Sequence, residues 1–209
     1  VIVLMDIWGL REELFDVACR IATVGYHVTV PNFWYRRGKV RFEYRDGKGR
    51  MISLLALPKA VQDELHANLN HVTDRMAMAD IGAILKFLGG EPVRPGPMGS
   101  IGYCMGGRLS LAAAAEFPEH FRASASLHGT RLVSDQPDSP HRLVGRMRGE
   151  VYCGFAEKDE WAPPSTIETL AQQFKGQPGV RYRSIFHAGT EHGYALPDRD
   201  IFNKPAANR

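Results

Sequence analysis

The segment 102–107, which reads GYCMGG, constrains the fold more than any other part of the chain. An apolar stretch at 98–103 leads into it, and an Ala-rich stretch at 105–117 follows and ends before a proline. The first stretch predicts a strand and the second a helix, so the chain must turn very sharply between them. Side chains two residues before and after the centre of such a turn would collide, and glycine at Gly102 and Gly106 removes that collision. A strand that passes directly into a helix is typical of a parallel sheet covered by helices.

Strand-like and helix-like stretches alternate along the whole chain. We expect strands at 1–5, 27–30, 98–103, 122–127, 150–155 and 180–186. We expect helices at 12–24, 65–88, 105–117 and 165–174. This alternation predicts an α/β protein with a mostly parallel, doubly wound sheet and helices on both faces. We predict a single domain over 1–209 with an irregular, basic insertion at about 31–58, of the kind that often forms a lid or a binding loop.

The composition is that of an ordinary folded domain, with 44% hydrophobic and 23% charged residues in 209. No apolar run approaches the roughly 20 residues that span a membrane, so we expect no membrane partner. The opening VIVLM is too short for a signal peptide and lacks a basic leader, so we expect no export signal. Three cysteines cannot all pair with one another, which fits a reducing compartment and predicts a cytoplasmic location. We expect a monomer or a small homo-oligomer.

The insertion carries much of the excess charge, because 36–50 holds seven Lys or Arg residues and only Glu43 and Asp46 as acids. Basic residues interleaved with Phe42 and Tyr44 are compatible with nucleic-acid binding. A solvated loop or hairpin is the commoner meaning of such a run, and we predict that no nucleic acid is bound. The run would also attract an anionic substrate by raising its local concentration. The sequence alone leaves open whether the insertion contacts the substrate.

Three residues follow predicted strands in an order that suggests nucleophilic catalysis. Cys104 occupies the sharp turn, Asp159 follows the strand at 150–155, and His192 follows the strand at 180–186. A nucleophile, an acid and a histidine in this order are typical of hydrolases built on such a turn, and the N-terminus of the next helix favours a thiolate. The alternative is a glycine-rich turn with a structural cysteine.

The remaining candidate side chains have simpler interpretations. Glu157 and Glu160 flank the acid and are expected to be solvated, and His187 is expected to be a packing or surface residue. The patterns around Cys19 and Cys153 predict small buried hydrophobic residues. We expect surface histidines at His66, His71, His120 and His141. No Cys/His cluster has zinc spacing and no phosphate-binding glycine loop is present, so we expect neither a metal nor a cofactor.

At these residues the chain resembles the dienelactone hydrolase family of α/β-hydrolases, whose members carry a Gly-x-Cys-x-Gly turn with a Cys, Asp, His order. The likeness covers nearly the whole chain and includes DIWG at 6–9. The resemblance implies hydrolysis of a small ester, lactone or thioester through an acyl-thioenzyme, with the backbone N–H groups of Ile7 and Met105 as the oxyanion hole. The alternatives are a catalytically silent binding protein with the same fold and a nucleic-acid-associated protein acting through 36–50.

The sequence departs from the family at two positions. Asp6 stands where the family usually has a Glu that contacts the resting thiol and helps switch it to thiolate. Leu196 stands where the dienelactone-cleaving enzymes have an Arg that holds the substrate carboxylate. We therefore expect weaker activity on dienelactone than on a neutral ester, unless Arg199 or the basic stretch supplies the missing charge. Both ends look short for an α/β-hydrolase, which usually has antiparallel strands before 1–5 and a full helix where 203–209 provides only its beginning.

Overall fold

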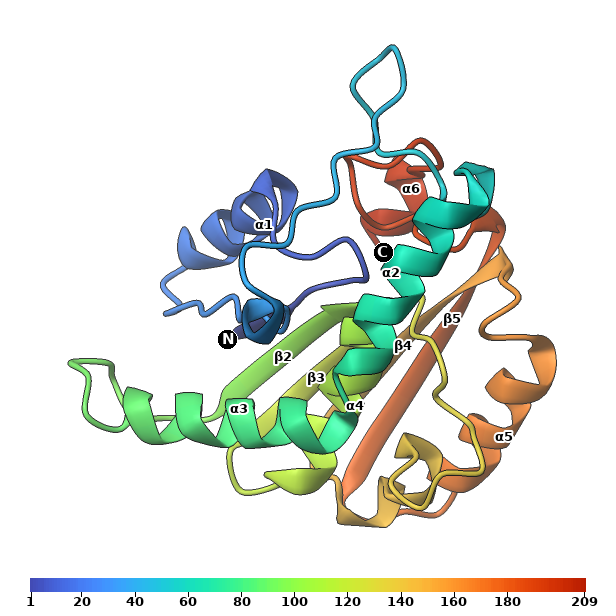
Figure 1. Ribbon diagram of the computed structural model, residues 1–209. Helices are drawn as coiled ribbons and strands as arrows, with labels where there is room; N and C mark the ends of the chain where they lie inside the picture. The colour runs from blue at the N-terminus through green and yellow to red at the C-terminus, as the bar shows by residue number, and fades with distance from the viewer.

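The computed structural model describes residues 1–209, and a five-stranded, entirely parallel sheet forms its centre (Figure 1). The strands lie in the order β1-β2-β3-β4-β5, the same order as in the sequence. Their bounds are Ile2–Leu4 (β1), Met98–Tyr103 (β2), Phe121–Leu127 (β3), Gly149–Lys158 (β4) and Val180–Glu191 (β5). Because all strands run the same way, their carboxyl ends meet at one edge of the sheet, where parallel α/β proteins form their sites.

Helices cover both faces of this sheet, as the alternation of the sequence predicts. Their bounds are Glu12–Ala22 (α1), Lys59–His71 (α2), Asp74–Leu88 (α3), Met105–Glu116 (α4), Pro164–Phe174 (α5) and Lys204–Ala207 (α6). On one face, Ser100 of β2 hydrogen-bonds Ser110 of α4 at 2.8 Å. The next residue, Ile101, points to the other face and shares a shallow hollow with Ile21 of α1.

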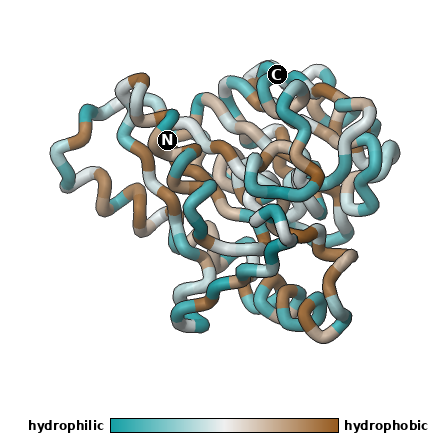
Figure 2. The backbone as a smooth tube through the Cα atoms, turned by 90° about the horizontal axis from the view of Figure 1, so that it is seen from above, coloured by the Kyte–Doolittle hydropathy of each residue, from teal (hydrophilic) through white to brown (hydrophobic).

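Polar and apolar residues are interleaved along most of the backbone, as the tube in Figure 2 shows. The longest buried apolar stretches are β1 and the Ala-rich α4, and both lie in the interior of the domain. No helix is both long enough and apolar enough to cross a membrane.

Two elements differ from the sequence-based prediction. The stretch 27–30 forms only one bridge, between Thr29 and Ile2, instead of a strand, because Pro31 has no N–H with which to continue the ladder. The expected helix at 65–88 is two helices, α2 and α3. Thr73 separates them, since its hydroxyl accepts the Met76 N–H and caps the start of α3.

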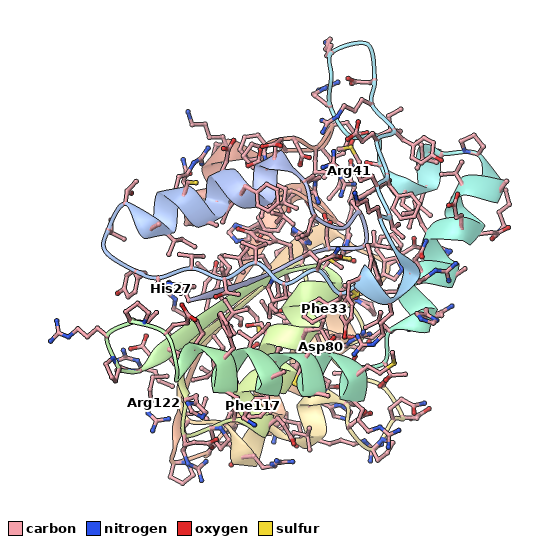
Figure 3. The ribbon with its side chains drawn as sticks, turned by 60° about the vertical axis from the view of Figure 1, so that its left-hand side comes forward. His27, Phe33, Arg41, Asp80, Phe117 and Arg122 are labelled. Carbon is pink, nitrogen blue, oxygen red and sulfur yellow. The ribbon has the colours of Figure 1, made fainter.

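The insertion at 31–58 is irregular, as expected, and part of it projects from the body as the narrow arm at the top of Figure 1. A bridge between Arg45 and Met51 closes this arm. Figure 3 shows Phe33 and Asp80 where the start of the insertion meets α3, and Arg41 on the side that leads into the arm. Phe33 is fully buried there.

The far end of the insertion is tied to the segment that follows β5. The Met51 N–H donates to the Asp198 carbonyl at 2.7 Å, and the Asp200 N–H donates to the Met51 carbonyl at 3.1 Å. The Asp200 carboxylate accepts the N–H and the hydroxyl of Ser53 at 2.9 and 2.7 Å. The insertion is therefore joined to the C-terminal part of the chain beside the carboxyl edge of the sheet.

The turn from β2 into α4 has the strained geometry that its glycines predict. Cys104 has a φ of 56°, in the left-handed region that few non-glycine residues adopt. A Cβ atom on Gly102 would overlap the backbone of Gly106, and a Cβ on Gly106 would overlap the backbone carbonyl of Leu4. The two glycines thus allow α4 to begin in direct contact with the end of β1.

We predict that Gly106→Ala lowers the free energy of unfolding by about 3 kcal/mol, because the added methyl group meets backbone atoms that no side-chain rotation can move. Gly47→Ala is the matched control, since a Cβ there meets open space at an ordinary φ. Urea unfolding of both variants measures the difference. Equal midpoints for the two variants would contradict the close approach at Gly106.

Candidate active site

Three side chains from the carboxyl edge of the sheet meet in one place. Cys104 follows β2, Asp159 follows β4, and His192 follows β5. The Nδ1 atom of His192 lies 2.8 Å from Oδ2 of Asp159, whose carboxylate is fully buried. The other oxygen of that carboxylate accepts the Trp161 N–H at 3.0 Å, which fixes the direction of Asp159. The sequence-predicted triad residues therefore lie together.

The charges around His192 favour its protonated form. Burial alone would lower its pKa, but attraction to a negative Cys104 sulfur and hydrogen bonds to Asp159 and Cys104 raise the pKa to about 9. At neutral pH the imidazole of His192 is therefore protonated. A protonated histidine favours the thiolate of a neighbouring cysteine, which is the reactive form of a cysteine nucleophile.

Of the two residues expected to form an oxyanion hole, Met105 directly follows Cys104 and Ile7 lines the same cavity as Cys104. Ile7 lies in the loop after β1, and Met105 is the first residue of α4. The backbone N–H of each donates no hydrogen bond within the protein. The next N–H in the loop, that of Trp8, is instead bound by the Asp6 carboxylate at 3.1 Å. Two unpaired donors beside a nucleophile are what stabilisation of an oxyanion needs.

A cavity of about 700 Å³ opens over these residues, large enough for a small organic molecule. The end of the insertion contributes Ser53, Leu54, Leu55 and Ala56 to its wall. Ile7, Trp8, Leu69 and Trp161 extend the apolar part of the lining. Charged side chains also line the cavity, namely Asp6, Arg131, Lys158, Glu160, Glu191 and Arg199, together with His66 and Thr130.

The resemblance implies a contact between Asp6 and the thiol of Cys104, but no hydrogen bond joins the two residues. The Asp6 carboxylate binds Arg11 through two hydrogen bonds, Nη1 to Oδ1 at 2.7 Å and Nη2 to Oδ2 at 3.0 Å. Asp6 is 1% exposed, so Arg11 neutralises a buried charge. The aspartate is one methylene shorter than glutamate, and its oxygens reach Arg11 and the Trp8 N–H instead.

Leu196 and Arg199 have separate environments. Leu196 is completely buried in the main core and does not line the cavity. Arg199 does line it, with its guanidinium carbon 5.2 Å from the centre of the Trp8 ring. The Arg199 side chain is nearly buried and donates no hydrogen bond, and the Asp6 carboxylate lies 4.0 Å from its Nη1. Of the two positions, only Arg199 brings a positive charge to the cavity.

The neighbouring acids and His187 match their simpler interpretations. Glu157 is exposed and accepts the Gly189 N–H at 2.6 Å, away from the cavity. Glu160 lies at the rim of the cavity and is exposed. His187 is buried and packs on Tyr194 with ring centres 4.9 Å apart. It lies within β5, which extends beyond the predicted strand end at 186. Asp159 is thus the acid that His192 contacts.

Sequence reasoning missed His128, which follows β3 and is completely buried behind the triad. Its ring lies 5.0 Å from that of His192, edge to face, and both of its nitrogens lack hydrogen-bond partners. Burial, and then the charge of His192, lower the pKa of His128 well below its ordinary value, so it remains neutral. Its position directly after a predicted strand was the available signal. His66 was also missed, since it lines the cavity and was expected on the open surface.

The structure contains no group of three or more His, Cys, Asp or Glu side chains placed to hold a metal ion. All three cysteines are unpaired, but the expectation of a buried Cys19 was wrong, because this residue is exposed on α1. The helix turns it outward, away from the face that carries the buried Leu14. Cys153 is buried as expected, and burial raises the pKa of its thiol to about 12.

We predict that iodoacetamide at pH 7 modifies Cys104 at least about tenfold faster than Cys19, because only Cys104 has a protonated histidine beside it. Cys153 should remain unmodified in the folded protein. Peptide mass spectrometry over a time course measures the three thiols separately, and Cys19 serves as the internal reference. Faster labelling of Cys19 would contradict the environment described for Cys104.

The chain is similar to several known proteins. A "Putative carboxymethylenebutenolidase" of Methylorubrum extorquens is 26% identical over 82% of the chain, which spans only 55% of that protein. A protein of the same name from Synechocystis sp. is 25% identical, with 99% of this chain and 80% of the relative covered. The crystal structure of a "Putative Dienelactone Hydrolase" from Klebsiella pneumoniae has the same fold, with a TM-score of 0.80 at 21% identity over 99% of this chain and 80% of that one. The sequence profile of the dienelactone hydrolase family matches residues 1–209. The chain therefore belongs to the dienelactone hydrolase family.

Proposed function

We propose that the protein hydrolyses small carboxylic esters or lactones, including thioesters, with Cys104 as nucleophile, His192 as acid and base, and Asp159 as the residue that orients His192. The observation that supports this most directly is the 2.8 Å contact from Asp159 to His192 on a cavity that also contains Cys104. The family of the chain is consistent with the reaction class. No cofactor is required by this chemistry.

The proposed reaction has two halves. With the thiol proton held by His192, the Cys104 sulfur forms a bond to the carbonyl carbon, and the carbonyl electron pair moves onto oxygen. The N–H groups of Ile7 and Met105 bind that oxyanion, and stabilisation of this kind is worth about 3 kcal/mol for each donor. When the electron pair returns, the C–O bond breaks and His192 protonates the leaving oxygen. Water, deprotonated by His192, then attacks the thioester and releases the acid and the thiol.

We further propose that Arg199 binds an anionic group of the substrate. A buried guanidinium without any hydrogen bond is costly, and a carboxylate in the cavity would satisfy it. Burial lowers the pKa of Arg199, although the nearby Asp6 carboxylate opposes that effect. The relatives' name, carboxymethylenebutenolidase, describes a lactone with a carboxylate-bearing substituent. In this proposal Arg199 binds the substrate carboxylate, a role for which the apolar Leu196 is unsuitable. Dienelactone-like acids are therefore candidate substrates.

The insertion and the thiols support two smaller proposals. Arg36 pairs with Asp80 and Arg50 with Asp46, so part of the basic charge is neutralised within the protein. This favours a solvated arm over a nucleic-acid site.

Three unpaired cysteines, one of them exposed, are compatible with the reducing conditions of the cytoplasm.

We predict that 4-nitrophenyl acetate gives a burst of nitrophenolate equal to the enzyme concentration, and that Cys104→Ala abolishes it. Asp159→Asn should lower kcat by roughly 10⁴-fold, because the amide no longer holds the imidazole in its productive tautomer. Glu160→Gln is the matched control on the cavity rim and should retain activity. Stopped-flow absorbance measures both phases. A burst that survives in Cys104→Ala would exclude this mechanism, and a wild type without turnover would favour a silent binding protein.

We predict that Arg199→Gln lowers kcat/KM for the anionic ester 4-nitrophenyl hemisuccinate by about 10- to 150-fold, which corresponds to the loss of charge-assisted hydrogen bonds. The value for neutral 4-nitrophenyl acetate should change little. Arg131→Gln is the control, because Arg131 lines the cavity but is exposed. Steady-state kinetics measures kcat/KM on both esters for the wild type and for each variant. Equal losses on the two esters would show that Arg199 does not recognise the anion.

A further inference from the structure

Arg11, at the start of α1, lies outside the triad and the cavity lining but makes more hydrogen bonds than any other side chain near them. Besides its two bonds to Asp6, its Nε donates to Asp198 at 2.6 Å and its Nη2 donates to the same carboxylate at 3.3 Å. Its Nη1 also reaches the Gly9 carbonyl at 3.3 Å. The Arg11 side chain is 7% exposed. This single guanidinium therefore joins the loop after β1 to the segment after β5.

Arg199 faces the same Asp6 carboxylate as a long ion pair and makes no hydrogen bond to it. Its Nη1 is 4.0 Å from Asp6 Oδ2, beyond hydrogen-bond distance. The Asp6 oxygens are instead occupied by Arg11 and by the Trp8 N–H. Without Arg11, Asp6 would be a buried carboxylate with Arg199 as its nearest cation. Attraction in a poorly solvated environment would then draw Arg199 into a direct ion pair.

The bond to Asp198 adds a second constraint. Asp198 directly precedes Arg199, and its carbonyl accepts the Met51 N–H from the insertion. Arg11 therefore fixes the backbone that carries Arg199. On its other side, Arg199 packs against Gly193, next to His192, where a Cβ would lie 3.1 Å from Nη1. The guanidinium is held close to the triad from both directions.

We propose that Arg11 is a positioning residue that binds Asp6 and Asp198 and thereby leaves the guanidinium of Arg199 available to an anion in the cavity. The inference rests on the anion-binding part of the proposed function. It assigns to Arg11 control of substrate charge preference and no part in bond making. A merely structural role would affect neutral and anionic reagents equally.

Alkylation of Cys104 tests this without requiring ester hydrolysis. The rates with anionic iodoacetate and neutral iodoacetamide are measured by peptide mass spectrometry, and the same ratio at exposed Cys19 is the internal reference. We expect the wild type to favour iodoacetate at Cys104 relative to Cys19. Arg11→Lys should reduce that preference about fivefold or more, because an ammonium cannot bind two carboxylates in the geometry of a guanidinium. The iodoacetamide rate should change by less than about twofold.

The matched control is Arg36→Lys, which alters an arginine bound to Asp80 by two hydrogen bonds outside the cavity lining. It should keep the wild-type ratio. Asp198→Asn keeps the hydrogen bonds from Arg11 to Asp6 and is the second test variant if Arg11→Lys does not fold. It should lower the preference of Cys104 for iodoacetate at least about twofold. An unchanged ratio in Asp198→Asn or in folded Arg11→Lys, equal losses with both reagents, or no anion preference in the wild type would each overturn the proposal. If the wild type hydrolyses no ester, the proposed reaction is refuted. The ratio of alkylation rates still tests the role of Arg11 in that case.

Discussion

The arrangement of the site depends on one backbone contact, the approach of Gly106 in α4 to the Leu4 carbonyl at the end of β1. The contact places the first turn of α4 beside the loop that contains Ile7. Between β2 and α4, Cys104 has a positive φ of 56°. Cys104 and the unpaired N–H groups of Ile7 and Met105 are held in place by backbone atoms, which hold position better than side chains do.

Around this rigid centre, the charges are organised in two layers. In the inner layer, buried Asp159 orients His192 and the sulfur of Cys104 stabilises its protonated form. In the outer layer, Arg11 bridges two carboxylates and leaves Arg199 without a hydrogen bond. In the proposed function, the inner layer carries out bond making and the outer one determines which substrate is accepted. The outer layer includes Asp6, one residue before Ile7, the proposed oxyanion donor.

The sequence predicted that Cys104, Asp159 and His192 lie together, but it did not predict the contacts of the outer layer. Cys104, Asp159 and His192 each follow a strand of a parallel sheet, so topology alone brings them together. Leu196 and Arg199 are three residues apart, yet Leu196 is buried in the core and Arg199 lines the cavity. The segment after β5 is irregular, so no helical or strand period shows which way each side chain points. Arg11 and Asp198 are 187 residues apart in the sequence, and no local pattern reports such a pair. Cys19 fitted a helical pattern, but periodicity did not show that it lies on the outer side of α1.

The backbone pairing of Met51 with the segment 198–200 has a consequence for how such proteins diversify. The part of the insertion that follows the arm, Ser53 to Ala56, forms part of the cavity wall, and Met51 joins it to the segment that carries Arg199. Changes in this part would alter the shape of the cavity without moving the strands that Cys104, Asp159 and His192 follow. We expect relatives that share the sheet and differ in this part of the insertion to differ in the substrates they select.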